Sequence, residues 1–193
     1  MDLLKRKVEA DGVVIDEKIL KVDGFLNHQI DAKLMHDVGL TFYNQFKDEG
    51  ITKVLTIEAS GIAPAIMAAM HFDVPCLFAK KAKPSTLTKN TYQADIHSFT
   101  KNTTSTVMVS DEFLDENDRV LIVDDFLANG DASLGLNEIV QQANAETVGI
   151  GIVVEKSFQP GRERLETAGL KVSSLCKVAS LSGNKVTFVE EQS

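Results

Sequence analysis

One stretch of the chain decides its fold: VLIVDDFLANGDAS, residues 120–133. The apolar residues 120–123 predict a buried strand, and Asp124 and Asp125 follow it directly. In open α/β sheets, ligands collect at the carboxyl ends of the strands, so these two acids are expected at a binding site. Small residues around Gly130 then predict a turn whose backbone N–H groups, from Ala128 to Ala132, form an anion-binding concavity at the start of a helix.

Taken alone, this pattern also describes an ordinary strand-to-helix connection in which an aspartate caps the helix. The order of residues, however, resembles the fingerprint of the type I phosphoribosyltransferases: four apolar residues, two acids, two further apolar residues and a small turn around glycine. The resemblance implies that Asp124 and Asp125 accept hydrogen bonds from the ribose hydroxyls of phosphoribosyl diphosphate, without acting as covalent nucleophiles. It also implies that the turn holds a phosphate.

The turn departs from the family pattern. Ala128, Asn129 and Ala132 stand where threonine or serine is usual, so the backbone N–H groups are expected to supply more of the phosphate contact. Asp131 carries a negative charge beside the predicted phosphate, and we expect its side chain to point outward or to cap the helix.

The bulk composition indicates a single domain. The chain has 193 residues, of which 44% are hydrophobic, which is enough for one sizeable core. The net charge of −8 argues against a nucleic-acid partner. No apolar run is long enough for a membrane span, and the first residues lack the apolar stretch of a secretory signal, so we expect a cytoplasmic protein with small-molecule substrates.

The cysteines and histidines predict no metal centre. Cys76 and Cys176 are far apart in sequence and are expected in the core. The four histidines show no metal-ligand spacing, and no chemistry is assigned to them.

Hydrophobic periodicity predicts an α/β fold: a mainly parallel, twisted sheet flanked by helices. Helices are expected at residues 3–9, 31–50, 62–72, 134–142 and 162–168, and strands at residues 13–15, 19–22, 54–57, 76–79, 106–110, 120–123, 147–154, 172–175 and 185–189. Residues 80–101 show no sustained period, which indicates either a functional loop or a disordered surface loop.

The family resemblance assigns these segments. It implies a hood built from about residues 13–30 and the C-terminal strands, and a flexible loop at 80–101 over the active site, in which Ser85 and Tyr92 are the side chains of interest. Residues 57–61 resemble the family's diphosphate loop, to which Lys80 and Lys81 add positive charge, although strand-to-helix turns commonly use serine and glycine. Mg²⁺ is implied, carried mainly by phosphoribosyl diphosphate, and a homodimer is expected.

The base preference is predicted from Lys156, at the end of a strand. A lysine there can donate to an exocyclic oxygen of an oxopurine, whereas the amino group of adenine could not accept this hydrogen bond. From surface statistics alone, a solvated lysine at a strand end is the ordinary expectation. Phe158 is expected in the core. Over its whole length the chain is similar to the xanthine-using bacterial branch of the family, and this likeness implies base contacts at Leu20, Asn27 and Lys156.

Two alternatives remain open from the sequence. One is a hypoxanthine or guanine phosphoribosyltransferase on the same scaffold. The other is a non-catalytic purine regulator that senses phosphoribosyl diphosphate, which is disfavoured by the acidic charge and by the lack of room for a DNA-binding domain ahead of the motif.

Overall fold

The computed structural model describes residues 1–81, 90–98 and 103–190. Its helices are α1 (Asp2–Asp11), α2 (Ala32–Phe46), α3 (Ile62–Phe72), α4 (Asp131–Gln142) and α5 (Gly161–Thr167), with short turns at η1 (Asp23–Asn27), η2 (Asp111–Phe113) and η3 (Ser182–Asn184). The strands are β1 (Val13–Ile15), β2 (Ile19–Lys21), β3 (Lys53–Ile57), β4 (Cys76–Ala79), β5 (Thr91–Ser98), β6 (Thr103–Ser110), β7 (Arg119–Leu127), β8 (Glu146–Lys156), β9 (Val172–Ser180) and β10 (Thr187–Phe188).

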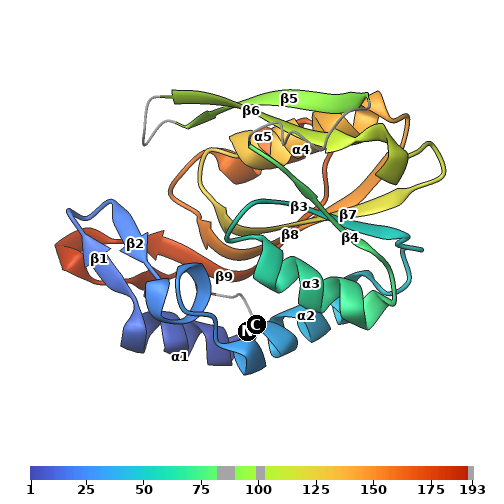
Figure 1. Ribbon diagram of the computed structural model, residues 1–193. Coiled ribbons are helices and arrows are strands. Elements are labelled where there is room, and N and C mark those ends of the chain that lie inside the picture. Colours follow the sequence, from blue (N-terminus) through green and yellow to red (C-terminus); the bar gives the residue numbers. More distant parts are fainter. Residues whose placement is uncertain (82–89, 99–102, 191–193) are drawn as a thin grey trace.

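The centre of the molecule is a six-stranded sheet in the order β10-β9-β8-β7-β3-β4. All of its neighbouring strands are parallel except β10, which is an antiparallel edge strand. Helices α1, α2 and α3 cover one face, while α4 and α5 cover the other, where the β5–β6 hairpin lies outside α4 (Figure 1). The predicted α/β class with a mainly parallel sheet is therefore confirmed.

Most of the predicted elements are present, but β5 was not predicted, and the strands predicted at 120–123 and 172–175 are longer, since β7 runs to Leu127 and β9 to Ser180. Residues 91–98 were expected to be irregular and instead form β5, which pairs along its whole length with β6. The strand predicted at 120–123 continues to Leu127, because β8 is long enough to pair with it in register as far as Leu127 and Glu155. Asp124 and Asp125 consequently lie inside β7 rather than beyond its end.

The helix boundaries follow from local chemistry. Helix α2 begins after Asp31, whose carboxylate accepts a hydrogen bond from the Leu34 backbone N–H at 3.0 Å. Helix α3 carries Pro64 in its first turn, where a missing N–H costs nothing, and ends at Asp73 in a left-handed conformation with φ of 55°. Among the described residues, no helix is long and apolar enough to cross a membrane.

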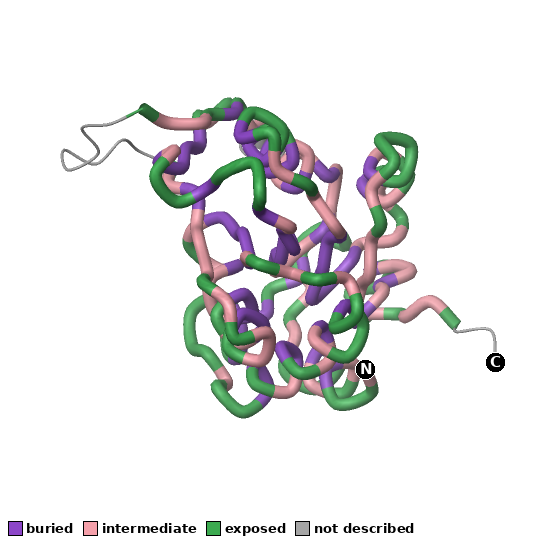
Figure 2. Tube along the Cα trace, turned by 90° about the vertical axis from the view of Figure 1, so that its right-hand side faces the viewer, coloured by how far each residue is buried: buried purple, intermediate pink, exposed green. Residues whose placement is uncertain are grey.

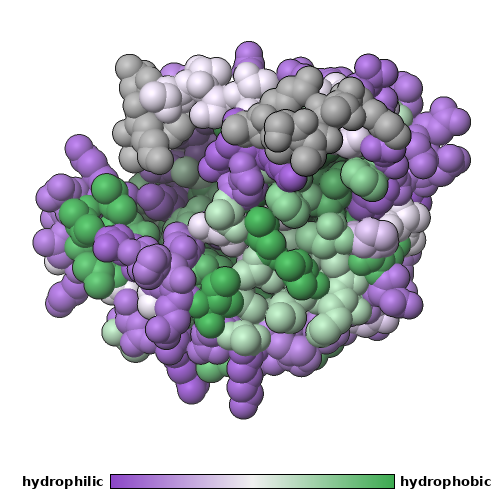
Figure 3. Space-filling view, viewed as in Figure 1, coloured by the Kyte–Doolittle hydropathy of each residue, from purple (hydrophilic) through white to green (hydrophobic). Residues whose placement is uncertain are grey.

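The hydrophobic core has two parts, one on each face of the sheet. The buried segments run through the middle of the trace and the exposed ones surround it (Figure 2). Cys176 is buried in this core, as predicted, while Cys76 is only partly buried. Hydrophobic residues also reach the surface over α3, where the exposed fractions of Ile66 and Met70 are 49% and 55% (Figure 3).

Two glycines of β8 allow α2 to approach the sheet closely. A Cβ added to Gly149 would lie 2.4 Å from the Phe46 ring, and one added to Gly151 would lie 2.8 Å from the Phe42 ring. Both rings are fully buried, so they cannot move aside into solvent. The rings therefore occupy the space that side chains on β8 would otherwise take.

We predict that Gly151→Ala lowers the free energy of unfolding by roughly 1 to 3 kcal/mol, because the added methyl group overpacks a closed core. Denaturant titration of both proteins measures this change. The matched control is Gly24→Ala, since a Cβ at Gly24 meets no atom within 4 Å. An equal loss of stability in the two variants would contradict this account of the packing.

Candidate active site

The site is built around Asp124, which is 4% exposed. Strand β7 carries it, and its Oδ1 accepts a hydrogen bond from the Asp125 backbone N–H at 2.9 Å. Gly61, at the start of α3, lies directly against it: a Cβ on Gly61 would be 3.0 Å from Asp124 Oδ1. The backbone of the loop at 57–61 thus packs against the acid with no side chain between them.

Burial raises the pKa of Asp124 well above its usual range, and the nearby charge of Asp125 raises it further. Burial also raises the pKa of Asp125, against the opposing effects of hydrogen bonds to Asp124 and to the backbone and of the Lys81 charge. Burial therefore disfavours the ionised form of Asp124 in the folded protein, and the two carboxyl groups titrate as a pair.

Both acids line one cavity of about 590 Å³, here called the carboxylate cavity. Its walls come from six parts of the chain: η1, the loop at 57–61, the segment after β4, the end of β7, the start of α4 and the β5–β6 hairpin. The lining residues outside β7 are Asn27, Ile57, Glu58, Ala59, Ser60, Gly61, Lys81, Ile96, Thr103, Ser105, Val107 and Ala132. The predicted diphosphate loop and Lys81 therefore lie together with the acidic pair, and the Lys81 backbone N–H donates to Glu58 Oε1 at 2.6 Å.

A second cavity of about 200 Å³, the loop cavity, adjoins the first and shares Ile96 and Ala132 with it. It is lined by residues 126–133, together with Ile96 and His97 of β5. Within it lies the turn at residues 128–132, here called the phosphate loop. Gly130 precedes α4 with φ of 86°, a conformation that favours glycine.

The phosphate loop runs into the first turn of α4, which begins at Asp131, and the N–H groups of a first turn have no partner within their own helix. One of the two arrangements expected for Asp131, capping of α4, is absent: the helix has no side-chain cap from the described residues. The Asp131 carboxylate instead accepts a hydrogen bond from Arg164 of α5 at 2.9 Å. This ion pair is how the chain tolerates an acid in the phosphate loop.

Lys156, at the end of β8, lies between the sheet and the β1–β2 hairpin. Its Nζ donates to the Lys18 carbonyl at 3.1 Å and lies 5.9 Å from the centre of the Phe126 ring. Burial lowers the pKa of this ammonium group. Phe126 borders the loop cavity, so Lys156 lies next to that cavity without lining it.

The neighbouring Glu155 points to the opposite face of β8 and is 2% exposed. Burial alone would raise the pKa of Glu155, but hydrogen bonds donated by Arg162, Ser174 and Ser157 outweigh it, and the pKa is lowered. Arg162 Nε and Nη2 bind the two carboxylate oxygens at 3.0 and 2.6 Å. This bidentate ion pair fixes α5 against the end of β8.

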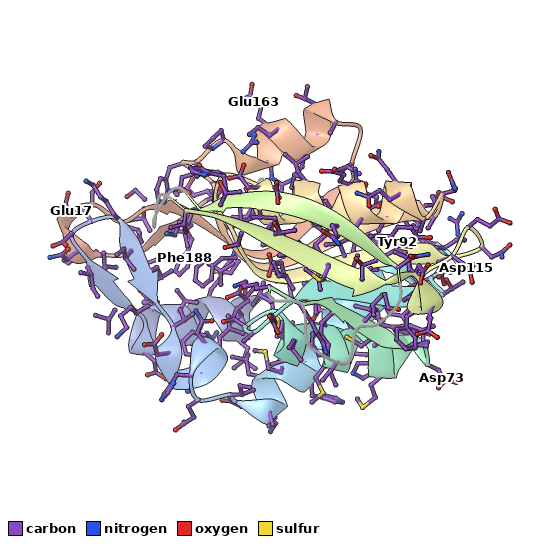
Figure 4. The ribbon with its side chains drawn as sticks, turned by 45° about the horizontal axis from the view of Figure 1, so that its top comes forward. Glu17, Asp73, Tyr92, Asp115, Glu163 and Phe188 are labelled. Atoms are coloured by element: carbon purple, nitrogen blue, oxygen red, sulfur yellow. The ribbon has the colours of Figure 1, made fainter. Side chains whose placement is uncertain are left out.

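Other predicted residues lie away from the cavities. Leu20 is 5% exposed and packs in the core, and Phe158, expected in the core, is 46% exposed instead. Tyr92 packs against the core at the side of the molecule near Asp115, opposite Glu17 (Figure 4). Lys80 lies over the Phe78 ring at 5.6 Å. Ser85 lies outside the described residues.

Sequence reasoning missed Thr56, Gly161 and Arg164. The Thr56 hydroxyl is fully buried without a hydrogen-bond partner, and a Cβ on Gly61 would lie 2.2 Å from it. Thr56 sits in an apolar strand, where a single threonine is unremarkable. Arg164 belongs to a short helix and contacts the phosphate loop only through the tertiary fold, so no local signal reveals it.

Comparison with known proteins gives consistent results. Residues 28–177 match the family model described as "Phosphoribosyl transferase domain". The chain is 89% identical over 192 residues to a protein of Staphylococcus saprophyticus named xanthine phosphoribosyltransferase, with full coverage of both chains. It is 80% identical, again with full coverage of both, to a protein of the same name from Staphylococcus aureus.

Solved structures share the fold at lower sequence identity. The adenine phosphoribosyltransferase of Thermoanaerobacter pseudethanolicus superposes with a TM-score of 0.76 at 21% identity, covering 91% of this chain and 98% of that one. The enzyme of Giardia lamblia, solved with 9-deazaadenine, gives 0.76 at 20% identity, covering 90% and 97%.

We predict that Asp124→Asn stabilises the protein at neutral and higher pH. The folded protein holds the Asp124 proton more tightly than the unfolded chain does. The free-energy cost of burying the ionised carboxylate is therefore absent below the pKa that Asp124 has in the unfolded chain, and it is complete above the pKa that Asp124 has in the folded protein. The amide avoids that penalty, and the gain should be roughly 0.5 to 2 kcal/mol at pH 8.

Thermal unfolding of the wild type and of Asp124→Asn between pH 4 and 8 measures this, with a gain that shrinks as the pH falls. A variant that is less stable than the wild type at pH 8 would show that the ionised Asp124 carboxylate does not destabilise the folded protein.

Proposed function

Because this chain belongs to the phosphoribosyltransferase family, we propose that it transfers the phosphoribosyl group of phosphoribosyl diphosphate to xanthine, which yields xanthosine 5'-phosphate and diphosphate in purine salvage. The observation that carries the proposal is the meeting of three elements at one place. The acidic pair, the loop at 57–61 and the phosphate loop line two adjoining cavities. Full-length relatives named xanthine phosphoribosyltransferase support the choice of base.

The chemistry follows from the charges that develop. A ring nitrogen of xanthine, whose proton is released to water, attacks the anomeric carbon of the ribose as the bond to diphosphate breaks. The ribose becomes more positive and the leaving group more negative. Asp124 and Asp125 accept hydrogen bonds from the ribose hydroxyls and hold the sugar in line for attack. Negative charge on the pair favours the oxocarbenium-like ribose more than the ground state.

The negative charge of the substrate lies at its two ends, on the diphosphate and on the 5'-phosphate, and each end is assigned its own donors. The loop at 57–61 and Lys81 face the carboxylate cavity and are assigned to the diphosphate, since ammonium groups and backbone N–H groups stabilise the departing anion. Ala128, Asn129, Gly130, Asp131 and Ala132 are assigned to the 5'-phosphate, with the contact made through the backbone.

Mg²⁺ fits this donor set as an ion brought in on the diphosphate. Among the described residues, no group of three or more His, Cys, Asp or Glu side chains is placed to hold a metal ion. Mg²⁺ needs only one or two carboxylates when phosphate oxygens and water complete its shell, and the acidic pair supplies such carboxylates at the cavity wall. When bound, the ion neutralises part of the charge on the diphosphate.

We assign the base to the region between the phosphate loop and the β1–β2 hairpin. Asn27 lines the carboxylate cavity and offers both a donor and an acceptor to the edge of xanthine. The Lys156 ammonium group has three donors, and Lys18 uses one, so it can donate to an exocyclic oxygen. Leu20 is packed in the core, so its assignment rests on resemblance and is limited to an indirect role beneath the base.

The proposed hood, about residues 13–30 with the C-terminal strands, is part of one phosphoribosyltransferase domain spanning residues 1–193. The Gly183 backbone N–H donates to Glu17 Oε1 at 2.8 Å, which ties the β1–β2 hairpin to the segment after β9. On the other side, the β5–β6 hairpin contributes Ile96, Thr103, Ser105 and Val107 to the cavity wall. Much of the loop predicted to cover the site, residues 82–89 and 99–101, lies outside the described residues. The hairpin would shield the activated sugar from water.

Two further features are proposed. A homodimer is assigned because two-fold dimers are the commonest oligomers. The exposed apolar residues Ile66 and Met70 on α3 offer a surface for it, and sedimentation of the intact protein tests this assignment.

A cytoplasmic location is assigned because a diphosphate ester such as phosphoribosyl diphosphate does not cross membranes unaided.

The decisive assay offers xanthine, hypoxanthine, guanine and adenine with phosphoribosyl diphosphate, with and without Mg²⁺. We expect the highest kcat/KM for xanthine, negligible turnover of adenine and loss of activity on chelation. A preference for hypoxanthine or guanine would support the alternative on the same scaffold.

In that assay, Asp124→Asn combined with Asp125→Asn should lower kcat about 100-fold or more. The control Asp37→Asn, on α2 and not among the residues that line either cavity, should leave kcat at the wild-type value.

We predict that Lys156→Ala costs about 1 to 3 kcal/mol in recognition of oxopurines, measured as kcat/KM for xanthine relative to adenine. The matched control is Lys171→Ala, because Lys171 also lies over a phenyl ring, 5.2 Å from the centre of Phe46, and is far from the cavities. Unchanged discrimination in Lys156→Ala would show that another group reads the base.

A further inference from the structure

We propose that Arg164 is a positioning residue that keeps the phosphate loop in the form that accepts an anion. Arg164 lies on the α5 side of the loop. Together with Gly161 it holds loop carbonyl groups toward α5, and it also neutralises the charge of Asp131. The proposal rests on the proposed function, in which this loop binds the 5'-phosphate.

Two successive carbonyl groups of the phosphate loop are tied to α5. The Gly161 backbone N–H donates to the Ala128 carbonyl at 3.0 Å. The Arg164 guanidinium donates to the next carbonyl, that of Asn129. Neither Gly161 nor Arg164 is among the described residues that line the loop cavity, so both bonds lie on the side of the loop away from it.

The orientation of the N–H groups follows from peptide geometry. The peptide bonds after Ala128 and Asn129 are trans, and in a planar trans peptide the N–H points opposite to the C=O. With both carbonyls held toward α5, the N–H groups of Asn129 and Gly130 point away from it, toward the loop cavity. In the part of the chain that the structure describes, neither N–H has a protein acceptor.

The same arginine removes an electrostatic obstacle. Arg164 Nη1 lies 2.9 Å from Asp131 Oδ1, and the Asp131 side chain is 18% exposed. Without a cation beside it, this carboxylate would stand at the cavity wall and repel a phosphate. One guanidinium thus holds both the carbonyl that directs an N–H donor and the carboxylate that would oppose the ligand.

Helix α5 is itself fixed in place, by backbone contacts with the phosphate loop and by an ion pair with β8. A Cβ on Gly130 would lie 3.2 Å from the Gly161 carbonyl oxygen, and one on Gly161 would lie 2.4 Å from the Ala128 carbonyl oxygen, so the two backbones are in direct contact. Arg162, next to Gly161, is bound to the buried Glu155 of β8. Helix α5 therefore cannot shift without breaking a buried ion pair.

The test replaces Arg164 with methionine, which keeps an apolar stem and removes the guanidinium, and with lysine, which keeps the charge on a flexible chain. For Arg164→Met we expect KM for phosphoribosyl diphosphate to rise about 10- to 100-fold, as for loss of a hydrogen bond to a charged group, while KM for xanthine changes little. Arg164→Lys should fall between the wild type and Arg164→Met. Calorimetric binding of ribose 5-phosphate should weaken in parallel, independently of turnover.

The role of charge is tested by combining Arg164→Met with Asp131→Asn. If Arg164 screens Asp131, the methionine substitution should raise KM for phosphoribosyl diphosphate less in the Asp131→Asn protein than in the wild type. Equal effects in the two backgrounds would overturn the charge part of the proposal.

The matched control is Arg119→Met. Arg119 likewise donates to a backbone carbonyl, that of Glu49, and pairs with a carboxylate, that of Glu146, but at the opposite end of β7. KM for both substrates should stay at the wild-type value. The proposal is overturned if Arg164→Met and Arg164→Lys leave KM for phosphoribosyl diphosphate unchanged, or if they raise both KM values equally with a loss of thermal stability. A wild-type protein with no transferase activity would instead contradict the proposed function.

Discussion

The pairing of β7 with β8 is the constraint on which the rest of the structure depends. The two parallel strands stay in register from Asp124 and Ile152 to Leu127 and Glu155, beyond the apolar run that starts β7. This continued pairing satisfies the backbone polar groups, so the chain can carry the Asp124 carboxyl into a water-excluded position at the end of the sheet. It also sets where β7 stops and the phosphate loop begins.

Strand β8 contributes to both faces of the sheet. Gly149 and Gly151 leave room for aromatic rings of α2. At the end of the strand, the adjacent side chains of Glu155 and Lys156 point to opposite faces: Lys156 reaches the β1–β2 hairpin, while Glu155 holds Arg162 and with it α5, which supports the phosphate loop. One strand end therefore organises the proposed base site and the proposed phosphate site, and their separation follows from the alternation of adjacent residues.

In the proposed function, an acidic protein with a net charge of −8 has to bind anionic substrates by local means. The cations that matter are few and placed singly: Lys81 lines the carboxylate cavity, Lys156 lies over Phe126, and Arg164 offsets Asp131. Backbone N–H groups supply the rest without adding charge. Each such interaction is short-ranged in salt, so the overall negative charge does not prevent binding at these points.

The sequence by itself determined the α/β class, most elements, the acidic pair with its glycine turn, and Lys156, because apolar periodicity and turn chemistry are local properties. It missed β5, whose residues become a strand only by pairing with β6, and it ended β7 too early, since the extension depends on β8. The burial of Leu20, the exposure of Phe158 and the bracing of the phosphate loop by Arg164 were likewise decided by the tertiary structure alone. Each depends on segments distant in sequence meeting in space, and no local pattern encodes which segments will meet.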